Sequence, residues 1–304
     1  MPSRTCALSS IYNVATVSAA GLNRPLAVAD RAKNVKQSSR TRRATESKPS
    51  APETLYGVHC CIEALRAKRR PILGLLVKPG AERRDEVRDL IAEAQAQRVG
   101  VRPLTSDPVD RGEFTNSQGV ALEVGPLPEV EIEQLAAPSA GPRRLVILDG
   151  VEDPQNVGAL ARVAEGAGAR GMVLSKRRAP PLSPALARAS AGAIEWLPVA
   201  RVTNLTRAIK YLKSQGFWVV GADLAARDSL YEIPDHVFQG DLAVVMGAEG
   251  KGLRPDIQKL VDHPVRIEMQ GRIQSLNVSA AGAVLLFELL RRAGLKADPK
   301  DISN

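Results

Sequence analysis

The chain has 304 residues, of which 44% are hydrophobic, and its formal net charge is +9. This length and apolar content allow a globular protein with two domains of ordinary size. The most apolar stretch, residues 280–290, is shorter than the roughly 20 residues of a membrane-spanning helix and contains Glu288, so we expect no membrane segment.

Cysteine and histidine are too few and too scattered for a disulfide framework or a metal site. The cysteines are Cys6, Cys60 and Cys61, and the three histidines form no H-x-x-x-H pattern. We therefore expect a reducing compartment and no bound metal.

Residues 1–53 are predicted to be a basic arm without a core of its own. Residues 1–50 hold nine Lys or Arg side chains and two acidic ones, so most of the net charge lies there. The rest of the chain is electrically mixed, and its charge alone does not identify an RNA partner. The Arg- and Ser-rich, acid-poor composition is typical of an organellar transit peptide. An RNA-binding tail and an extension from an upstream start codon are the alternatives.

The globular pattern begins near Leu55, and residues 54–126 are predicted to form a small α/β domain. The expected elements are a helix from Tyr56 to Lys68, a strand at Ile72–Val77, a surface helix at Ala81–Arg98 and an apolar run at Val120–Val124. Prolines and a Ser-Ala-Gly cluster make residues 127–142 typical of a linker, and residues 296–304 form a short tail.

Strands and helices alternate through residues 143–295, which predicts a parallel sheet covered on both faces. The expected strands are Leu145–Leu148, Met172–Leu174, Trp218–Gly221, Leu242–Met246 and Val265–Ile267, and the expected helices are Val157–Ala167, Leu205–Gln215 and Val278–Arg292. Ligands of open parallel sheets bind beyond the carboxyl ends of the strands. We therefore expect the site in the loops after Leu148, Gly221, Met246 and Ile267.

The segment Gly166–Gly171 matches G-x-G-x-x-G, but it closes a predicted helix and precedes a strand. A dinucleotide fingerprint has the opposite context, because the helix N-terminus must face the pyrophosphate. We interpret these glycines as a helix C-cap. A nicotinamide-dependent enzyme has no other support in the sequence.

The segment Met246–Leu253 follows a strand directly, and its glycines would let the backbone approach a ligand closely. It is not a P-loop, because Gly252 stands where that motif has Ser or Thr. Glu249 lies in the middle of the turn. The alternative interpretation is a tight surface loop with a solvated glutamate.

Polar side chains also gather before two of the predicted helices. Ser275, Asn277 and Ser279 precede the last helix, where any of them could be an N-cap. Residues 149–156 could likewise be a capped turn between a strand and a helix, with Arg162 solvated on that helix.

Taken together, these segments resemble the three sequence motifs of the SpoU family of ribose methyltransferases. Residues 153–158 followed by Arg162 resemble motif one, residues 246–253 resemble motif two, and residues 275–279 resemble motif three. Their order, spacing and strand–loop context all agree. The resemblance covers residues 144–292 and, more weakly, the region that begins at Leu55.

The resemblance implies an α/β fold whose parallel sheet carries a carboxyl-terminal trefoil knot, a feature that general packing rules argue against. It implies that the preceding small α/β domain is a substrate-binding domain similar to ribosomal protein L-thirty-e. It also implies a homodimer with the active site at the interface, and S-adenosylmethionine as the cofactor, held largely by main-chain groups. The residues expected to line or adjoin the cofactor pocket are Gly221, Met246, Gly247, Ile267 and Leu276.

The implied reaction is methylation of a ribose 2′-hydroxyl of RNA, so catalysis must orient the hydroxyl and help to remove its proton. The resemblance places Arg162 nearest the hydroxyl, with Asn156, Glu249, Ser275 and Asn277 organising the hydroxyl and the RNA backbone. Because arginine stays protonated, we expect Arg162 to clamp a phosphate and stabilise alkoxide charge.

Residues 194–205 resemble the subgroup that methylates a guanosine in large-subunit (23S-type) rRNA. Transfer RNA is the main alternative substrate, and a non-catalytic RNA-binding ribosome-assembly factor is the alternative function. Only 3% of residues are aromatic, so a base-stacking surface is not expected. The bacterial character of the folded region favours the cytoplasm, with mitochondrion or plastid as the alternative.

Overall fold

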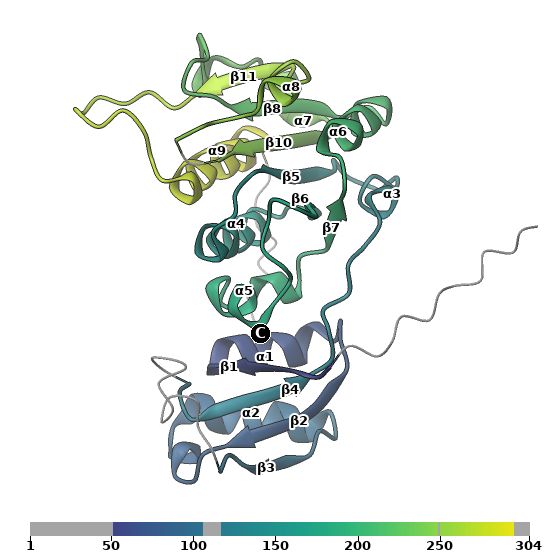
Figure 1. Ribbon diagram of the computed structural model, residues 1–304, viewed down its shortest axis with the longest axis vertical. Helices are drawn as coiled ribbons and strands as arrows, with labels where there is room; N and C mark the ends of the chain where they lie inside the picture. Colours follow the sequence, from purple (N-terminus) through teal and green to yellow (C-terminus); the bar gives the residue numbers. More distant parts are fainter. Residues whose placement is uncertain (1–50, 106–116, 249, 295–304) are drawn as a thin grey trace, which may run out of the picture. The chain divides into compact units, whose positions relative to one another are not determined.

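The computed structural model describes residues 51–105, 117–248 and 250–294. Residues 1–50 of the predicted arm, the tail 296–304 and Glu249 lie outside the described residues. The described chain folds around two sheets (Figure 1). No helix in these ranges is long and apolar enough to cross a membrane, and no three acidic, His or Cys side chains there are grouped to hold a metal ion.

The first sheet belongs to what we call the amino-terminal module, the described residues between 51 and 124. Its four strands have the order β1-β4-β2-β3, and only β2 and β3 run parallel. The strands are β1 Glu53–Tyr56, β2 Ile72–Val77, β3 Val101–Pro103 and β4 Val120–Val124, and the helices are α1 Val58–Ala67, the short η1 Ala81–Arg83 and α2 Asp85–Ala96.

The second sheet belongs to the carboxyl-terminal module, residues 125–294 as far as described. It has seven strands in the order β7-β6-β5-β10-β8-β11-β9, and every neighbouring pair is parallel, as predicted. The strands are β5 Arg144–Asp149, β6 Gly171–Ser175, β7 Val199–Val202, β8 Trp218–Ala222, β9 Asp228–Ser229, β10 Leu242–Gly247 and β11 His263–Arg266.

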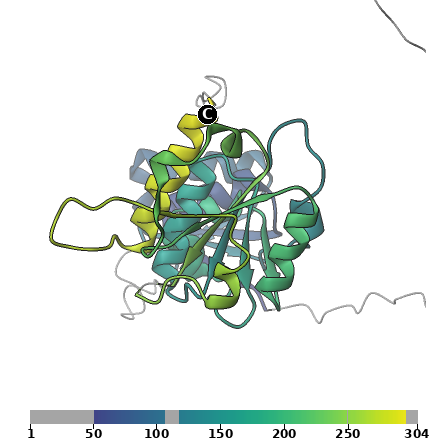
Figure 2. The same ribbon diagram turned by 90° about the horizontal axis from the view of Figure 1, so that it is seen from above.

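Helices cover both faces of this sheet, because alternate residues of the central strands enter two separate cores (Figures 1 and 2). In β5, Val146 and Leu148 pack against α4, α5, α7 and α9, whereas Leu145 and Ile147 pack on the side of α3, α6 and α8. The helices are α3 Ile132–Leu135, α4 Pro154–Gly166, α5 Pro184–Ala189, η2 Ala193–Glu195, α6 Leu205–Ser214, η3 Leu230–Glu232, α7 Asp235–Gln239, α8 Pro255–Gln258 and α9 Val278–Arg292.

The glycines of Gly166–Gly171 end α4, as predicted, through a Schellman motif. Gly168 has a φ of +69°, and its N–H donates to the carbonyl of Glu165 at 2.8 Å. The N–H of Ala169 donates to the carbonyl of Ala164, also at 2.8 Å. The match to a dinucleotide fingerprint is therefore a helix terminus.

The region predicted as a linker contains a short helix that the sequence pattern did not indicate. Glu131 and Gln134 form a capping box around the first turn of α3, and Ile132 and Leu135 are buried. The strand expected at Val265–Ile267 is β11. It begins two residues earlier than predicted, at His263, and ends one residue earlier, at Arg266. Ile267 therefore lies in the loop that follows the strand.

Candidate functional site

Three loops that carry the motif-like segments meet at one edge of the seven-stranded sheet. Strands β5, β10, β8 and β11 are consecutive neighbours and parallel, so their carboxyl ends lie side by side. The segments after β5, β10 and β11 are far apart in the sequence. The order of the strands in the sheet places these three segments next to one another, at the carboxyl ends of the strands, where open parallel sheets bind their ligands.

The loops after β8, β10 and β11 enclose a pocket with about 780 Å³ of open space. Four of the residues expected to hold the cofactor line it: Met246, Gly247, Ile267 and Leu276. The neighbour of Gly221, Ala222, lines the pocket, while Gly221 lies against Val261 and Leu253. The other lining residues are Asp223, Leu224, Ala248, Gly250, Gly252, Val265, Arg266, Met269, Ser275, Val278 and Ala281.

The loop after β10 folds back on itself at the mouth of this pocket. The backbones of Ala248 and Gly252 exchange two hydrogen bonds, of 3.1 and 2.9 Å. A Cβ on Gly247 would lie 2.3 Å from the carbonyl carbon of Gly252, so glycine is required for this close approach. Gly250 and Gly252 have φ values of +74° and +63°, and a Cβ on either would meet open space.

Asn277 joins two of the motif-like segments. It is the N-cap of α9, because its Oδ1 accepts hydrogen bonds from the N–H of Ser279 at 2.8 Å and from the hydroxyl of Ser279 at 2.6 Å. Its Nδ2 donates to Oδ1 of Asn156, near the start of α4, at 3.0 Å. The side chain that was predicted to belong to the site is thus also the cap of α9, and its Nδ2 orients the amide of Asn156.

Helix α4 begins as predicted, with Asp153 as the N-cap and its carboxylate accepting from the N–H of Gln155 at 3.0 Å. Arg162 is exposed on the same helix and lines neither this pocket nor the cavity beside it. Arg162 follows Asn156 by six residues, which in an α-helix correspond to a rise of about 9 Å and a net rotation of about 240° around the helix axis. Arg162 therefore points away from Asn156 within one chain.

A second cavity, with about 1280 Å³ of open space, adjoins the first. The two share Ala248, Gly252 and Val278, so the loop after β10 and the start of α9 separate them. The second cavity is lined by Asn156, by the cations Arg178, Lys251 and Arg254, and by the acids Asp149, Glu152 and Asp153. Polar and charged side chains suit this cavity for a charged ligand, in contrast to the mainly apolar first pocket.

Arg254 has a structural role that the sequence pattern did not indicate. The carboxylate of Asp149, at the end of β5 and only 1% exposed, accepts from the N–H of Arg254 at 2.9 Å and from its Nε at 2.6 Å. These contacts tie the loop after β10 to the carboxyl end of β5, although the two residues are 105 positions apart in the sequence. A buried aspartate at a strand end needs such a partner, but the sequence does not say which cation supplies it.

Replacing Asp149 by Ala is expected to lower the free energy of unfolding by about 2–4 kcal/mol, because an amide and a guanidinium lose their shared acceptor. The loop after β10 should also loosen and weaken binding in the first pocket. Urea denaturation checks the stability. Asp256→Ala is the matched control, since this exposed carboxylate lies 3.9 Å from Arg254 and its loss should cost less than about 1 kcal/mol. Equal losses in the two variants would contradict the assigned role.

No cysteine belongs to the site among the described residues. Cys60 and Cys61 lie in the core of the amino-terminal module. Burial, followed by the nearby charge of Glu195, raises the pKa of the Cys60 thiol to about 12. Neither thiol is available as a nucleophile at neutral pH. Cys6 lies outside the described residues.

Comparisons with known proteins agree with this arrangement. Residues 143–287 match the SpoU rRNA Methylase family, and residues 54–130 match the RNA 2′-O ribose methyltransferase substrate binding family. The first match contains all of the loops that form the two cavities. The second covers the strands of the amino-terminal module except for Glu53, the first residue of β1.

Relatives extend over most of the chain. A 23S rRNA (guanosine-2′-O-)-methyltransferase RlmB of Pseudomonas syringae is 37% identical over 81% of this chain and 98% of its own length. A Bacillus subtilis protein, named as a TrmH-family tRNA/rRNA methyltransferase, is 34% identical over 78% of this chain and 95% of its own. The crystal structure of an AdoMet-bound rRNA methyltransferase from Sinorhizobium meliloti is 25% identical, with a TM-score of 0.65 over 81% of this chain and 88% of that one. The chain therefore belongs to the SpoU rRNA methylase family.

Proposed function

We propose that this protein is an S-adenosylmethionine-dependent methyltransferase that modifies the ribose 2′-hydroxyl of a guanosine in large-subunit (23S-type) rRNA. The observation that carries the proposal is the convergence of three motif segments on two adjoining cavities, with Asn277 bonded to Asn156 between them. Relatives named RlmB support the choice of a guanosine in 23S rRNA.

The first pocket fits S-adenosylmethionine. Met246, Ile267 and Leu276 give it an apolar lining, while Gly250 and Gly252 present bare backbone to a ligand. The AdoMet-bound neighbour from Sinorhizobium meliloti supports the same cofactor. When bound, it supplies an activated methyl group on a sulfonium. We propose that these residues hold it, with Gly247 in the lining and Gly221 behind it, packed against the side chains of Val261 and Leu253.

The second cavity is proposed to receive the acceptor nucleotide. Arg178 and Lys251 supply positive charge for its phosphates, and Asn156 lies at the boundary with the first pocket. Ser275 lines the first pocket, where its hydroxyl can donate to the ribose. Glu249, which lies outside the described residues, is proposed to help organise the reacting hydroxyl, as the family resemblance implies. Arg162 is proposed to clamp a phosphate and stabilise the alkoxide charge that develops as the 2′-hydroxyl loses its proton.

Because Arg162 lies outside both cavities of its own chain, we propose that it reaches the site of a second copy in a homodimer. The surface of α9 offers a contact for such a copy, since Phe287 is 48% exposed there. The segment between β11 and α9 projects from the module and exposes Ile273 (Figure 1). Because a two-fold axis repeats every contact in both chains, each chain would supply Arg162 to the site of the other, and two complete sites would form.

Three further features are proposed on the family resemblance. Residues 54–126, which include most of the amino-terminal module, are proposed to bind the RNA, and residues 143–295 to form a methyltransferase domain. The segment from β11 to α9 is proposed to complete a trefoil knot. The cytoplasm is the proposed location, with mitochondrion or plastid as the alternative, because the relatives are bacterial proteins.

The test is methyl transfer from labelled S-adenosylmethionine to purified ribosomal RNA and transfer RNA, with the labelled nucleotide mapped by its resistance to alkaline cleavage. We expect label on the ribose of one guanosine in large-subunit rRNA. Label confined to transfer RNA would favour the substrate suggested by the name of the Bacillus subtilis relative. Cofactor binding without transfer to either RNA would overturn the proposal in favour of an assembly factor.

A further inference from the structure

The segment Ser190–Leu197, which includes η2, lies against the amino-terminal module. Gly192 has a φ of +87°, and a Cβ there would come within 2.6 Å of the Cβ of Glu63 in α1. The indole Nε1 of Trp196 donates to the carboxylate of Glu63 at 2.7 Å. Glycine is therefore required at this contact, where α1 approaches the backbone of the other module.

An ion pair lies at the centre of this contact, and both of its side chains are buried. Arg70 binds Glu195 through two hydrogen bonds, from Nε to Oε2 at 2.9 Å and from Nη2 to Oε1. The third nitrogen, Nη1, donates to Glu53 at 3.0 Å and to the carbonyl of Gly125 at 3.3 Å. All three nitrogens of the Arg70 guanidinium thus have acceptors.

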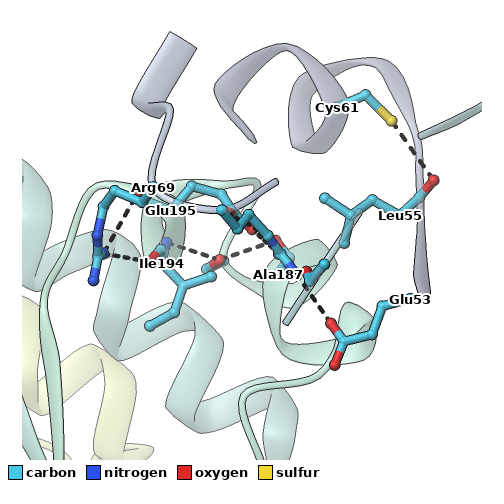
Figure 3. A network of polar contacts seen from close by, with 10 residues as sticks. Glu53, Leu55, Cys61, Arg69, Ala187, Ile194 and Glu195 are labelled. Atoms are coloured by element: carbon cyan, nitrogen blue, oxygen red, sulfur yellow. Dashed lines mark hydrogen bonds and ion pairs between the residues drawn. The ribbon is translucent and has the colours of Figure 1, made fainter. Parts of the chain in front are cut away.

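The neighbouring arginine adds contacts to the backbone of the same segment. Nη1 of Arg69 donates to the carbonyl of Glu195 at 3.2 Å and to that of Ile194 at 3.4 Å. Figure 3 shows Arg69 and Glu53 of the amino-terminal module around Ile194 and Glu195. The two modules also share one continuous apolar core, which includes Ile194 and Leu65.

Apolar packing and an ion pair contribute differently to such a contact. Apolar surfaces tolerate small rotations and shifts, whereas a buried bidentate pair is satisfied in a single orientation. If the modules rotate and the two side chains separate, each is left as a buried charge with neither its partner nor water around it, which is strongly unfavourable. The apolar core therefore holds the modules together, and the pair selects how they fit.

We infer that Arg70 and Glu195 are positioning residues, which hold the amino-terminal module in one orientation and thereby determine which nucleotide of a long RNA reaches the second cavity. The part concerning RNA rests on the proposed function. Neither residue lines the two cavities, so their effect on the reaction passes through the placement of the bound RNA.

The test uses the double variant Arg70→Leu/Glu195→Leu in the full chain. Removing both charges leaves neither Arg70 nor Glu195 as an unpaired buried ion, and such replacements are often neutral for stability. Glu53, whose side chain is 27% exposed, loses its contact with Nη1 of Arg70 but stays in reach of water. The matched control is Arg143→Leu/Asp241→Leu, because this ion pair also has low exposure but lies wholly within the carboxyl-terminal module. Both variants and the parent protein carry Trp218→Phe, which leaves Trp196 as the one tryptophan in the chain.

The first measurement is quenching of Trp196 fluorescence by acrylamide, and it needs no RNA. Trp196 is already 44% exposed, so full opening of its contact with α1 would raise quenching by only about twofold. We expect a smaller but reproducible rise in the Arg70/Glu195 variant, because the contact opens transiently, and no change in the control. Quenching equal to that of the parent protein in the Arg70/Glu195 variant would overturn the inference.

The second measurement compares methyl transfer on long rRNA. We expect the KM for RNA to rise about tenfold, as for the loss of roughly 1.4 kcal/mol of binding, and label to spread to neighbouring nucleotides. The affinity for S-adenosylmethionine and kcat at saturating RNA should stay as in the parent protein, whereas a general loss of folded protein would lower kcat. An unchanged KM with one labelled nucleotide would also overturn the inference. If the parent protein methylates no RNA, the proposed function fails, and the quenching measurement still decides whether the pair holds the modules.

Discussion

Replacing Gly247 by Ala is expected to weaken binding of S-adenosylmethionine by about 100-fold or more, because overpacking against rigid backbone costs about 3 kcal/mol. The added Cβ would lie 2.3 Å from the carbonyl carbon of Gly252 and 2.6 Å from the nitrogen of Leu253. Neither atom is at the end of a flexible side chain, so the whole loop after β10 must move. Isothermal titration calorimetry with the cofactor measures the change in affinity.

The control for this variant is Gly141→Ala. A Cβ at Gly141 meets nothing within 4 Å, so this substitution should leave cofactor affinity and stability close to the wild type. A loss of affinity at Gly247 alone would then follow from the crowding at that position. A Gly247→Ala protein that binds the cofactor normally would show that the turn between Ala248 and Gly252 does not shape the pocket.

Replacing Arg162 by Ala is expected to lower kcat for methyl transfer by about 100- to 1000-fold, the size of effect found when a donor to developing negative charge is removed. The affinity for S-adenosylmethionine should stay within about twofold, because Arg162 lines neither cavity. Arg162→Lys keeps the charge but loses the planar pair of donors, so it should recover only part of the activity. Full turnover of Arg162→Lys is the result that contradicts a phosphate clamp.

Mixing the two inactive variants tests whether Arg162 acts across a dimer interface. In a heterodimer of Arg162→Ala and Gly247→Ala chains, the second chain supplies Arg162 to the intact pocket of the first. Random pairing then restores about a quarter of the wild-type sites. If Arg162 acts within its own chain, every site in the mixture lacks either Arg162 or an intact cofactor pocket, so no activity returns. Coexpression with two purification tags provides the material.

The sequence was most informative where an apolar pattern extends over many residues and where the residues of a motif are close together in the sequence. Strands β5 and β10 and helix α9 are apolar over most of their length, and they were predicted within one or two residues. By contrast, α3 has four residues, too few for a helical period to be visible. None of the three residues of strand β3 is buried, so its sequence lacks the apolar pattern of a core strand.

The same distinction applies to the site. The bond between Asn156 and Asn277 joins two segments that the motifs had already singled out, although 121 residues separate them. The contact between Asp149 and Arg254 has no motif of its own, and it depends on the pairing of β5 with β10. The contact between Arg70 and Glu195 depends on how two modules pack. Local chemistry can be read from a sequence, whereas these partners are fixed only by tertiary structure.

The contribution of the start of α9 to the cofactor pocket also has a consequence for synthesis of the protein. The cofactor pocket needs residues from β8 to the first turns of α9, so a nascent chain that has emerged only as far as β10 has no pocket. The amino-terminal module, whose strands are close in sequence, can fold earlier. With the proposed RNA-binding role of the amino-terminal module, a growing chain would hold RNA before it can bind the methyl donor, because the cofactor pocket is complete only once α9 has been made.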